Sequence, residues 1–314
     1  MINNLFLFNI YYFHSLIVVS KNLNITNLFL LIAPPLFWAG NFVIGRIVRD
    51  DIGPMSLSFW RWVIAFCCLL PFVYKYMKRD WPLYKEHLGF VLKTSLVGVT
   101  SFNTLIYLGL HGTTATNAVL LNSTIPILIV LFSVLFYKQR LYTLPTIGLI
   151  MSLFGVGVII LNGDINALLS FSFNRSDLII FTAMVCWSIY TLWMKNTPQG
   201  MDRTALTCVQ IAIAVIALFP LWLWESGGQL PIHLNNDAKM ALLYVGIFPS
   251  VIAYVAYSLA ISRVGPMISG LFINLMPVFG VILAALFAGE SIHLYHILGI
   301  ALIAIGLILS SRQS

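Results

Sequence analysis

Charged residues are scarce in this chain: they account for 9% of its 314 residues, whereas 60% are hydrophobic. About a quarter of the residues of an ordinary soluble domain are charged, so this composition excludes that class. The four cysteines, Cys67, Cys68, Cys186 and Cys208, lie in apolar stretches and form no CxxC or Cys/His pattern. A disulfide framework and a zinc site therefore have no support, and we expect neither a metal nor a cofactor.

Acidic side chains are missing from the middle of every apolar stretch. They lie at the ends of such stretches or in polar joints: Asp50, Asp51, Asp80, Glu86, Asp164, Asp177, Asp202, Glu225, Asp237 and Glu290. Proton-driven pumps commonly carry a carboxylate in the middle of the membrane, so the sequence does not predict an acidic proton relay. The motifs GxxxxGK[ST], HExxH and GxSxG are also absent, which leaves ATP-driven and common hydrolytic chemistry without support.

Long apolar stretches make up most of the chain. A helix needs roughly 20 apolar residues to cross the ~30 Å hydrocarbon layer. Such stretches occur at 28–48, 55–74, 88–110, 114–137, 143–162, 177–195, 204–224, 239–261, 267–288 and 292–310. The expected fold class is therefore an all-α integral membrane protein with ten transmembrane helices.

The net charge of +7 comes from basic residues that are scattered through the polar joints. No basic and aromatic face forms, so we expect no nucleic-acid partner. With the start of the first stretch inside, twelve of the 17 lysines and arginines lie on the cytoplasmic side and four on the opposite side. Cytoplasmic loops carry an excess of Lys and Arg, so both termini are expected in the cytoplasm.

One segment of the chain recurs later in the sequence. Leu120 to Gly157 aligns without gaps with Leu271 to Ile308, 151 residues further on. The aligned pairs include Pro126 with Pro277, Gly148 with Gly299, Gly155 with Gly306, and Gln139 with Glu290; Trp38 with Trp187 and Arg61 with Gln210 are further pairs, 149 residues apart. A repeat of this period in so apolar a chain is typical of a transporter built from two copies of one unit.

The repeat divides the chain into two halves. We expect an N-terminal extension at 1–27, a first repeat at 28–162, a linker at 163–176 and a second repeat at 177–311. Each half holds five membrane-crossing stretches. Because five is odd, the second copy enters the membrane from the opposite side, and the halves are predicted to be inverted repeats around one central site.

Several motifs resemble a known family. They are PPLFWAGNFVIGR at 34–46, SLSFWRWVIAF at 56–66, and the segments from TATNAVLLNSTIP to FYKQRL and from VGPMISGLFINLMP to FAGESI. Over residues 28–311 the chain resembles the EamA-type members of the drug/metabolite transporter superfamily, whose ten helices form two five-helix repeats. The resemblance implies export of small metabolites, often amino acids or amphipathic compounds, across a bacterial inner membrane. Gln139 departs from the family pattern, which has glutamate there, as Glu290 does in the second copy.

Arg61 is the one full charge well inside an apolar stretch. A charge there costs about 2.5 to 3.5 kcal/mol on insertion scales, so it requires a polar cavity or a partner. Two readings stay open: Arg61 attracts an anionic group of a substrate, or it is a structural pin bonded to the backbone. Uncharged polar and aromatic residues inside the stretches complete the candidates for a central cavity, because they too need partners: Trp38, Asn41, Asn103, Tyr107, Asn117, Asn122, Trp187, Tyr190, Gln210, Tyr254, Tyr257 and Asn274.

The leading hypothesis is a secondary transporter, an exporter of small metabolites that works by alternating access, without enzymatic activity. We expect a facilitator or exchanger, with a small-molecule substrate and membrane lipid as partners, acting as a monomer or a homodimer. A multidrug exporter of the same fold is an alternative. A membrane enzyme acting on lipid would require clustered acids or histidines, for which Glu290, His293 and His296 come closest. A passive channel would require a selectivity filter or a ring of charges, which the sequence does not offer.

Overall fold

A computed structural model describes residues 24–48, 51–113, 115–140, 142–164, 174–228, 235–287 and 291–311. Most of the expected N-terminal extension, the centre of the linker and Glu290 lie outside these residues. Throughout the described part the chain is helical, and no strand occurs in it. Eight helices are long and apolar enough to cross a membrane, and two shorter apolar helices, at 25–41 and 294–310, accompany them.

The first repeat supplies the helices from α2 to α9. Their bounds are α2 (Ile25–Ile47), α3 (Pro54–Arg79), α4 (Trp81–Glu86), α5 (Leu88–Thr94), η1 (Ser95–Ser101), α6 (Phe102–Gly112), α7 (Ala115–Asn122), α8 (Ile125–Tyr137) and α9 (Thr143–Ile160). The segments α5, η1 and α6 form one continuous crossing, and so do α7 and α8. The first repeat thus has four candidate spans and the shorter apolar helix α2, which together account for the five stretches that the sequence predicts.

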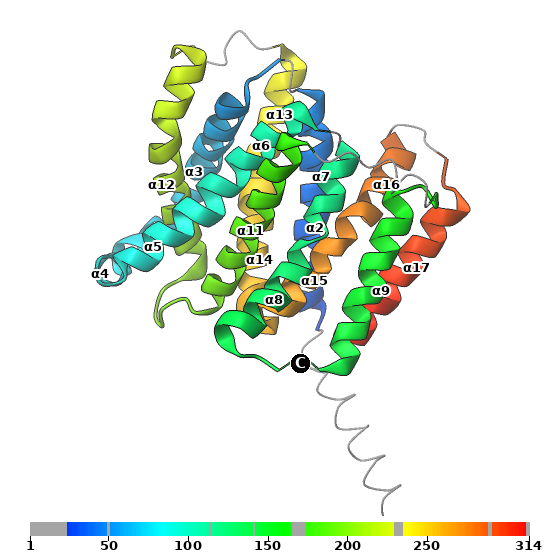
Figure 1. The fold of residues 1–314 in the computed structure, drawn as a ribbon. Helices are drawn as coiled ribbons and strands as arrows, with labels where there is room; N and C mark the ends of the chain where they lie inside the picture. The colour runs from blue at the N-terminus through cyan, green and yellow to red at the C-terminus, as the bar shows by residue number, and fades with distance from the viewer. Residues whose placement is uncertain are drawn as a thin grey trace, which may run out of the picture.

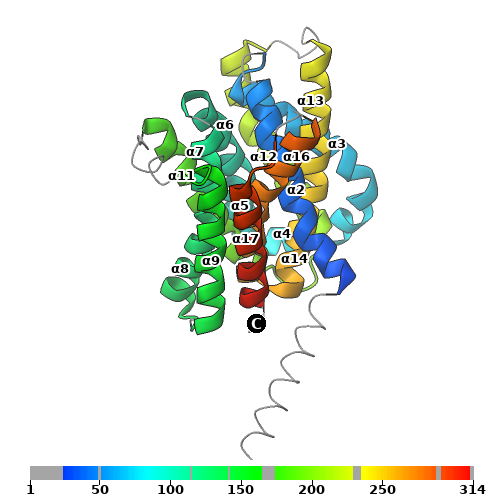
Figure 2. The ribbon, with the colours of Figure 1, turned by 90° about the vertical axis from the view of Figure 1, so that its right-hand side faces the viewer.

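The second repeat follows the same order. Its elements are α11 (Arg175–Lys195), α12 (Arg203–Ser226), α13 (Asn236–Ile247), η3 (Phe248–Ile252), α14 (Ala253–Val264), α15 (Pro266–Leu271), η4 (Phe272–Asn274), α16 (Leu275–Phe287) and α17 (Leu294–Ser311). In Figure 1, α2 rises from the lower end of the bundle and α17 returns to it. We call this end, which carries α4 and the end of α17, the lower end, and the opposite one the upper end. The view turned by 90° shows the same arrangement (Figure 2).

The long helices α3 and α12 cap each other in a symmetric way. At the upper end, the Glu225 carboxylate accepts hydrogen bonds from the backbone N–H groups of Met55 (3.0 Å) and Ser56 (2.7 Å) at the start of α3. At the lower end, the Asp80 carboxylate accepts a bond from the backbone N–H of Asp202, 2.7 Å away, at the start of α12. An acid from each repeat thus satisfies the free N–H groups of the other repeat's helix, where negative charge is also favoured by the helix dipole.

Paired glycines bring α9 and α17 together. A Cβ atom on Gly148 would collide with the backbone oxygen of Gly306, and one on Gly155 with the backbone oxygen of Gly299. The repeat relates Gly148 to Gly299 and Gly155 to Gly306, so exchanging the two halves maps each contact onto the other. This is the relation expected of inverted repeats around a twofold axis, and small residues permit such close approach of membrane helices.

Two departures from regular helix occur at equivalent places. The third crossing contains the π-helical η1 and the eighth contains η3, and their last residues, Ser101 and Ile252, are 151 positions apart. The sequence predicts membrane-crossing stretches at 88–110 and 239–261, which include both segments. Pro249 has no N–H to donate, which accounts for the disruption in η3. In η1, Gly98 lets the ring of Tyr190 approach the backbone closely.

Candidate functional site

A small cavity lies at the centre of the bundle, beside the midpoints of α2 and α11. Both repeats line it with Trp38, Asn41, Phe102, Asn103, Ile106, Asn122, Ile125, Trp187, Ile273 and Met276. Its volume is about 20 Å³, which is room for roughly one water molecule. The surrounding side chains therefore enclose a closed central space.

Two tryptophans from equivalent positions of the repeats meet at this cavity. The rings of Trp38 and Trp187 lie edge to face, with their centroids 5.1 Å apart. Tyr254 and Tyr257 of α14 pack against both, at centroid distances between 5.2 and 6.1 Å. Because Trp38 donates from Nε1 to the carbonyl of Pro249, 3.1 Å away, its ring is fixed in orientation. The pseudo-twofold axis thus passes through an aromatic cluster.

Arg61 lies on α3 and is 1% exposed. Its Nε donates to the hydroxyl of Ser250 at 2.8 Å, and its Nη1 donates to Asn103 Oδ1 at 3.0 Å and to the hydroxyl of Tyr107. In the described part of the chain no carboxylate oxygen lies within 4.0 Å of its guanidinium. The positive charge is therefore held by neutral groups and by the face of Trp62, whose ring centroid is 4.9 Å from Cζ.

Hydrogen bonds connect Arg61 to the cavity lining. Tyr107, which accepts from Arg61, donates to Asn41 Oδ1 at 3.0 Å. Asn103 donates from Nδ2 to the hydroxyl of Tyr254 at 2.7 Å. Asn41 and Tyr107 lie one turn closer to the upper end than Trp38 and Asn103, since α2 and α6 both run upwards. This network from α2, α3, α6 and the second repeat closes the upper side of the cavity.

The candidate residues named from the sequence fall into three groups. Trp38, Asn41, Asn103, Asn122 and Trp187 line the cavity. A second group touches these residues from behind: Arg61, Tyr107, Tyr190, Tyr254 and Tyr257. Three candidates have other partners. Asn117 donates to Asp177 Oδ1 at 3.4 Å, Gln210 donates to Thr94 at 2.9 Å, and Asn274 donates to Ser152 at 2.9 Å.

Several residues of the site were not among the predicted set. Ser250 bonds to Arg61, and the apolar lining comes from Phe102, Ile106, Ile125, Ile273 and Met276. Apolar side chains within apolar spans carry no sequence signal that separates a cavity wall from a lipid-facing surface.

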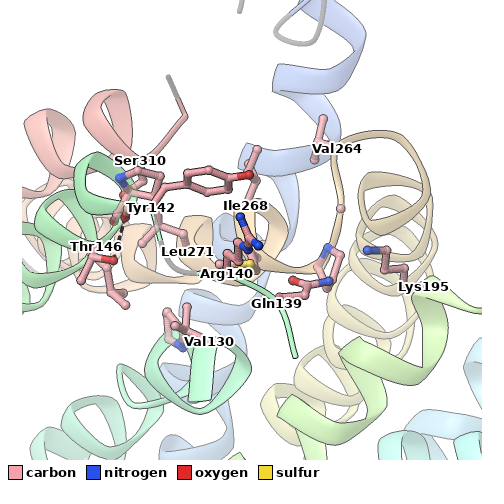
Figure 3. Close-up of a pocket in the computed structure, with 16 residues that line it drawn as sticks. Val130, Gln139, Arg140, Tyr142, Thr146, Lys195, Val264, Ile268, Leu271 and Ser310 are labelled. Carbon is pink, nitrogen blue, oxygen red and sulfur yellow. Dashed lines mark hydrogen bonds between the residues drawn. The ribbon is translucent and has the colours of Figure 1, made fainter. Parts of the chain in front are cut away.

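A larger pocket of about 440 Å³ opens at the lower end. Figure 3 shows its lining side chains, which come from α8, α9, α11, α14, α15, α17 and the connections between them. The walls are apolar, with Val130, Leu149, Ile268 and Leu271 among them. Arg140 and Lys195 supply its charged groups, and none of the residues that line it is acidic.

A thin apolar barrier separates the pocket from the cavity. Pro126 lines the pocket while its neighbour Ile125 lines the cavity, and Leu271 lines the pocket while Ile273 lines the cavity. Ile129, which is fully buried, packs directly against Gly270 between them. The barrier therefore consists of one or two layers of side chains at the breaks between α7 and α8 and between α15 and α16.

One acid is buried more deeply than its place in the sequence indicates. Asp177, in the first turn of α11, is fully buried. It forms a capping box with Asn174, and its Oδ1 accepts a hydrogen bond from the hydroxyl of Thr113. The carboxylate still lies at the upper end of its helix, where its Oδ2 accepts the capping bond from the backbone N–H of Asn174 at 2.9 Å.

The residues proposed for an alternative enzyme do not gather into a described metal site. His293 donates from its backbone N–H to Nδ1 of His296 at 3.0 Å, so one imidazole caps the start of α17. Glu290 lies outside the described residues. Within the part of the chain that the structure covers, no group of three or more His, Cys, Asp or Glu side chains is arranged to hold a metal.

Comparison with known proteins agrees with this architecture. Residues 25–161 and 174–312 each match the EamA-like transporter family. The chain is 25% identical over 296 residues to the uncharacterized transporter YyaM of Bacillus subtilis (strain 168), covering 93% of this chain and 94% of the relative. It is 29% identical over 255 residues to an uncharacterized transporter of Archaeoglobus fulgidus, covering 81% of this chain and 86% of the relative.

Solved structures extend this comparison to the fold. A protein crystal structure with 17% sequence identity has a TM-score of 0.65 and covers 88% of this chain and 95% of its own. At this identity the likeness concerns the fold. The two family matches, the repeated helices and the transporter relatives together establish that the chain belongs to the EamA-like transporter family and is a multi-pass membrane transporter.

Proposed function

We propose that this protein is a secondary transporter that exports small metabolites, such as amino acids or amphipathic compounds, by alternating access. One observation carries the proposal: the equivalent residues Trp38 and Trp187 meet at a cavity lined by both repeats. If the repeats exchange conformations, a site on their symmetry axis opens first to one end and then to the other.

The closed network and the open pocket support this cycle. On the upper side of the cavity, Asn41, Tyr107 and Arg61 are joined by hydrogen bonds. On the lower side, the barrier at Ile129 and Gly270 is followed by the pocket. We assign the lower end to the cytoplasm, because the described residues Lys75, Lys78, Lys85, Lys93, Lys138, Arg140, Lys195 and Arg263 lie there, in line with the excess of cytoplasmic positive charge. The membrane in question is the inner, or plasma, membrane.

The aromatic cluster and the neutral polar groups fit a solute with apolar and hydrogen-bonding parts. A bare ion or a sugar phosphate requires several inward charges, and among the residues that the structure describes Arg61 is the single charged side chain that bonds to the cavity lining. A multidrug exporter of cationic compounds is the alternative, and the buried positive charge disfavours it.

Counterflow in proteoliposomes tests the proposal. A thermal-shift screen of the purified protein against amino acids and amphipathic compounds selects solutes, and vesicles loaded with a hit are then diluted into labelled solute. We expect transient accumulation of label, which a channel does not produce. Trp187→Ala is expected to abolish it, whereas Trp224→Ala, at a side chain that is 83% exposed on α12, is expected to leave it intact. Equal loss in both variants, or formation of product from lipid, contradicts the proposal.

A further inference from the structure

The lower pocket has the dimensions of a ligand site in its own right. Its volume of about 440 Å³ falls within the range of small-molecule pockets, about 300 to 1,000 Å³. The central cavity, at about 20 Å³, holds no metabolite in this conformation. A solute entering from the lower end therefore meets this pocket first.

The charges around the pocket have one sign. Arg140, in the connection between α8 and α9, and Lys195, at the end of α11, both line it. The remaining polar side chains are neutral: Gln139, Tyr142, Thr146 and Ser310. With two cations, several hydrogen-bonding groups and no acid in its lining, the pocket is complementary to a single anionic group.

The depth of the pocket is apolar. Pro126, Val130, Leu149, Ile268 and Leu271 line it, and in Figure 3 Val130 and Leu271 lie to the left of Arg140, whereas Lys195 lies to the right of it. A ligand that satisfies both parts has an anionic head beside Arg140 and Lys195 and an apolar body against these side chains.

A further positive charge, that of Arg61, lies on the far side of the barrier. Arg61 is buried, and no carboxylate of the described residues lies within 4.0 Å of it. Asn103 and Tyr107 connect it to the cavity. A negative group that passes from the lower pocket past Ile129 therefore moves from one pair of cations towards another cation.

We propose that the lower pocket is the entry site for an amphipathic organic anion, a carboxylate on an apolar or aromatic body. Arg140 and Lys195 select the carboxylate, and the apolar wall holds the body until the barrier opens. The proposal deepens the transport function above and rests on it, because it names the class of solute that the central site receives.

Three probes of nearly equal shape test the charge preference: 3-phenylpropanoate, 3-phenylpropanamide and 3-phenylpropylammonium. Binding to the full-length protein in neutral phosphatidylcholine nanodiscs is measured by calorimetry. We expect the carboxylate to bind about tenfold or more tightly than the amide, equivalent to about 1.4 kcal/mol or more, and the ammonium most weakly. Arg140→Gln with Lys195→Gln is expected to remove that preference.

The matched control removes two other exposed basic residues of the lower end, Lys75 and Lys78, which do not line the pocket. Lys75→Gln with Lys78→Gln is expected to keep the preference for the carboxylate. Equal binding of carboxylate and amide in the unmodified protein, or an unchanged preference in the Arg140 and Lys195 variant, overturns the proposal. The proposal is also overturned if phosphatidylglycerol displaces the carboxylate and the Arg140 and Lys195 variant loses only the binding of that lipid. The occupant of the pocket is then a lipid headgroup.

Counterflow with the same probes separates this proposal from the broader one. If a neutral or cationic solute shows counterflow while the carboxylate preference is absent, the transport function stands and the anion site fails. If the carboxylate binds with the expected preference but no solute shows counterflow, the anion site stands as a binding site and the transport function fails.

Discussion

Asn103 donates a hydrogen bond to the hydroxyl of Tyr254, 2.7 Å away, and these two residues occupy the same position in the two repeats, 151 residues apart. The amide of Asn103 also donates to the carbonyl of Val99 at 3.1 Å, and the hydroxyl of Tyr254 donates to the carbonyl of Gly98 at 3.2 Å. Gly98 and Val99 belong to η1, where the regular helix ladder is disrupted. One bond between equivalent residues therefore ties the repeats together and satisfies carbonyls that the π-helical turn leaves available.

Removing the hydroxyl of Tyr254 is expected to weaken the joint between the repeats. Tyr254→Phe deletes the acceptor of Asn103 and the donor to Gly98, so we expect a loss of roughly 1 to 2 kcal/mol in the free energy of unfolding. Thermal unfolding in detergent, calibrated with a denaturant titration, measures it. Tyr74→Phe, at a side chain that is 59% exposed, is the control and is expected to have no effect. Equal stability of both variants contradicts this role.

The duplicated fold was predictable from residues with strong local constraints. Pro126 and Pro277 restrict the backbone, and Gly148 and Gly299 each permit close packing of a helix. The equal spacing of these two pairs along the sequence revealed the repeat. Ten apolar stretches with five in each half then led to inverted repeats. The ten-helix fold follows from these features, whereas the family was indicated by the resemblance of longer motifs such as PPLFWAGNFVIGR at 34–46.

The site was less accessible to sequence reasoning. Polar residues inside a membrane span need partners, but the sequence does not say whether the partner is a solute, water or another helix. Gln210 and Asn274 were included on this ground, and the structure gives each a partner on another helix, Thr94 and Ser152 respectively. Whether the five predicted residues that line the cavity bind a solute stays a prediction.

A methyl group at Gly155 is expected to force α9 and α17 apart. An added Cβ would lie 2.7 Å from the backbone oxygen of Gly299, and a backbone atom cannot move aside as a flexible side chain does. Gly155→Ala is therefore expected to lower the free energy of unfolding by about 1 to 3 kcal/mol. Gly157→Ala, two positions later in the same helix, meets no atom within 4 Å. We expect it to be neutral or to stabilise by up to about 1 kcal/mol, as the same unfolding assay would show.

The reciprocal caps predict a pH dependence at the lower end. Burial raises the pKa of Asp80, but the hydrogen bonds from Arg79 and from the backbone of Asp202 outweigh it and leave that pKa below its ordinary value. A carboxyl whose pKa is lowered by folding stabilises the protein above its unfolded pKa of about 3.9. That contribution is lost as the pH falls through the lower, folded value.

Asp80→Asn should therefore be less stable than the unmodified protein at neutral pH and should converge with it in acid. Unfolding measured from pH 7 down to about pH 3 tests this. The control is Asp237→Asn, which alters an exposed acid in the first turn of α13 at the upper end. A stability difference for Asp80→Asn that stays constant over the whole range would show that the carboxylate charge does not contribute.

Transport is expected to proceed without a proton gradient. The described acids lie at helix ends, and this includes the two buried ones, Asp80 and Asp177. None of them provides the carboxylate in the middle of the membrane that proton-driven pumps commonly carry. Counterflow of a selected solute should therefore be unchanged when an ionophore collapses the pH difference. Strict dependence on that gradient would contradict the facilitator or exchanger mechanism, and Asp177→Asn would then be the first variant to assay.

The last prediction separates the two roles left open for Arg61. If Arg61 attracts the anionic group of a solute, Arg61→Gln raises the KM for an anionic solute by on the order of tenfold, because a charge in a poorly solvated site acts over several ångströms. Uptake of a neutral solute should then change little. Arg61→Lys keeps the charge but loses the fork that reaches Ser250 and Asn103, so it should recover part of the affinity.

A structural pin gives a different pattern. Both substitutions would then lower the thermal stability, while the ratio of KM values for anionic and neutral solutes would stay constant. Lys239→Gln removes an exposed positive charge from the upper end and controls for the general surface potential. Because Arg61 bonds to Tyr107 and through it to Asn41 on another helix, we expect some loss of stability in either case. The KM ratio is therefore the measurement that decides, and an unchanged ratio in a well-folded Arg61→Gln protein would remove the solute-binding role.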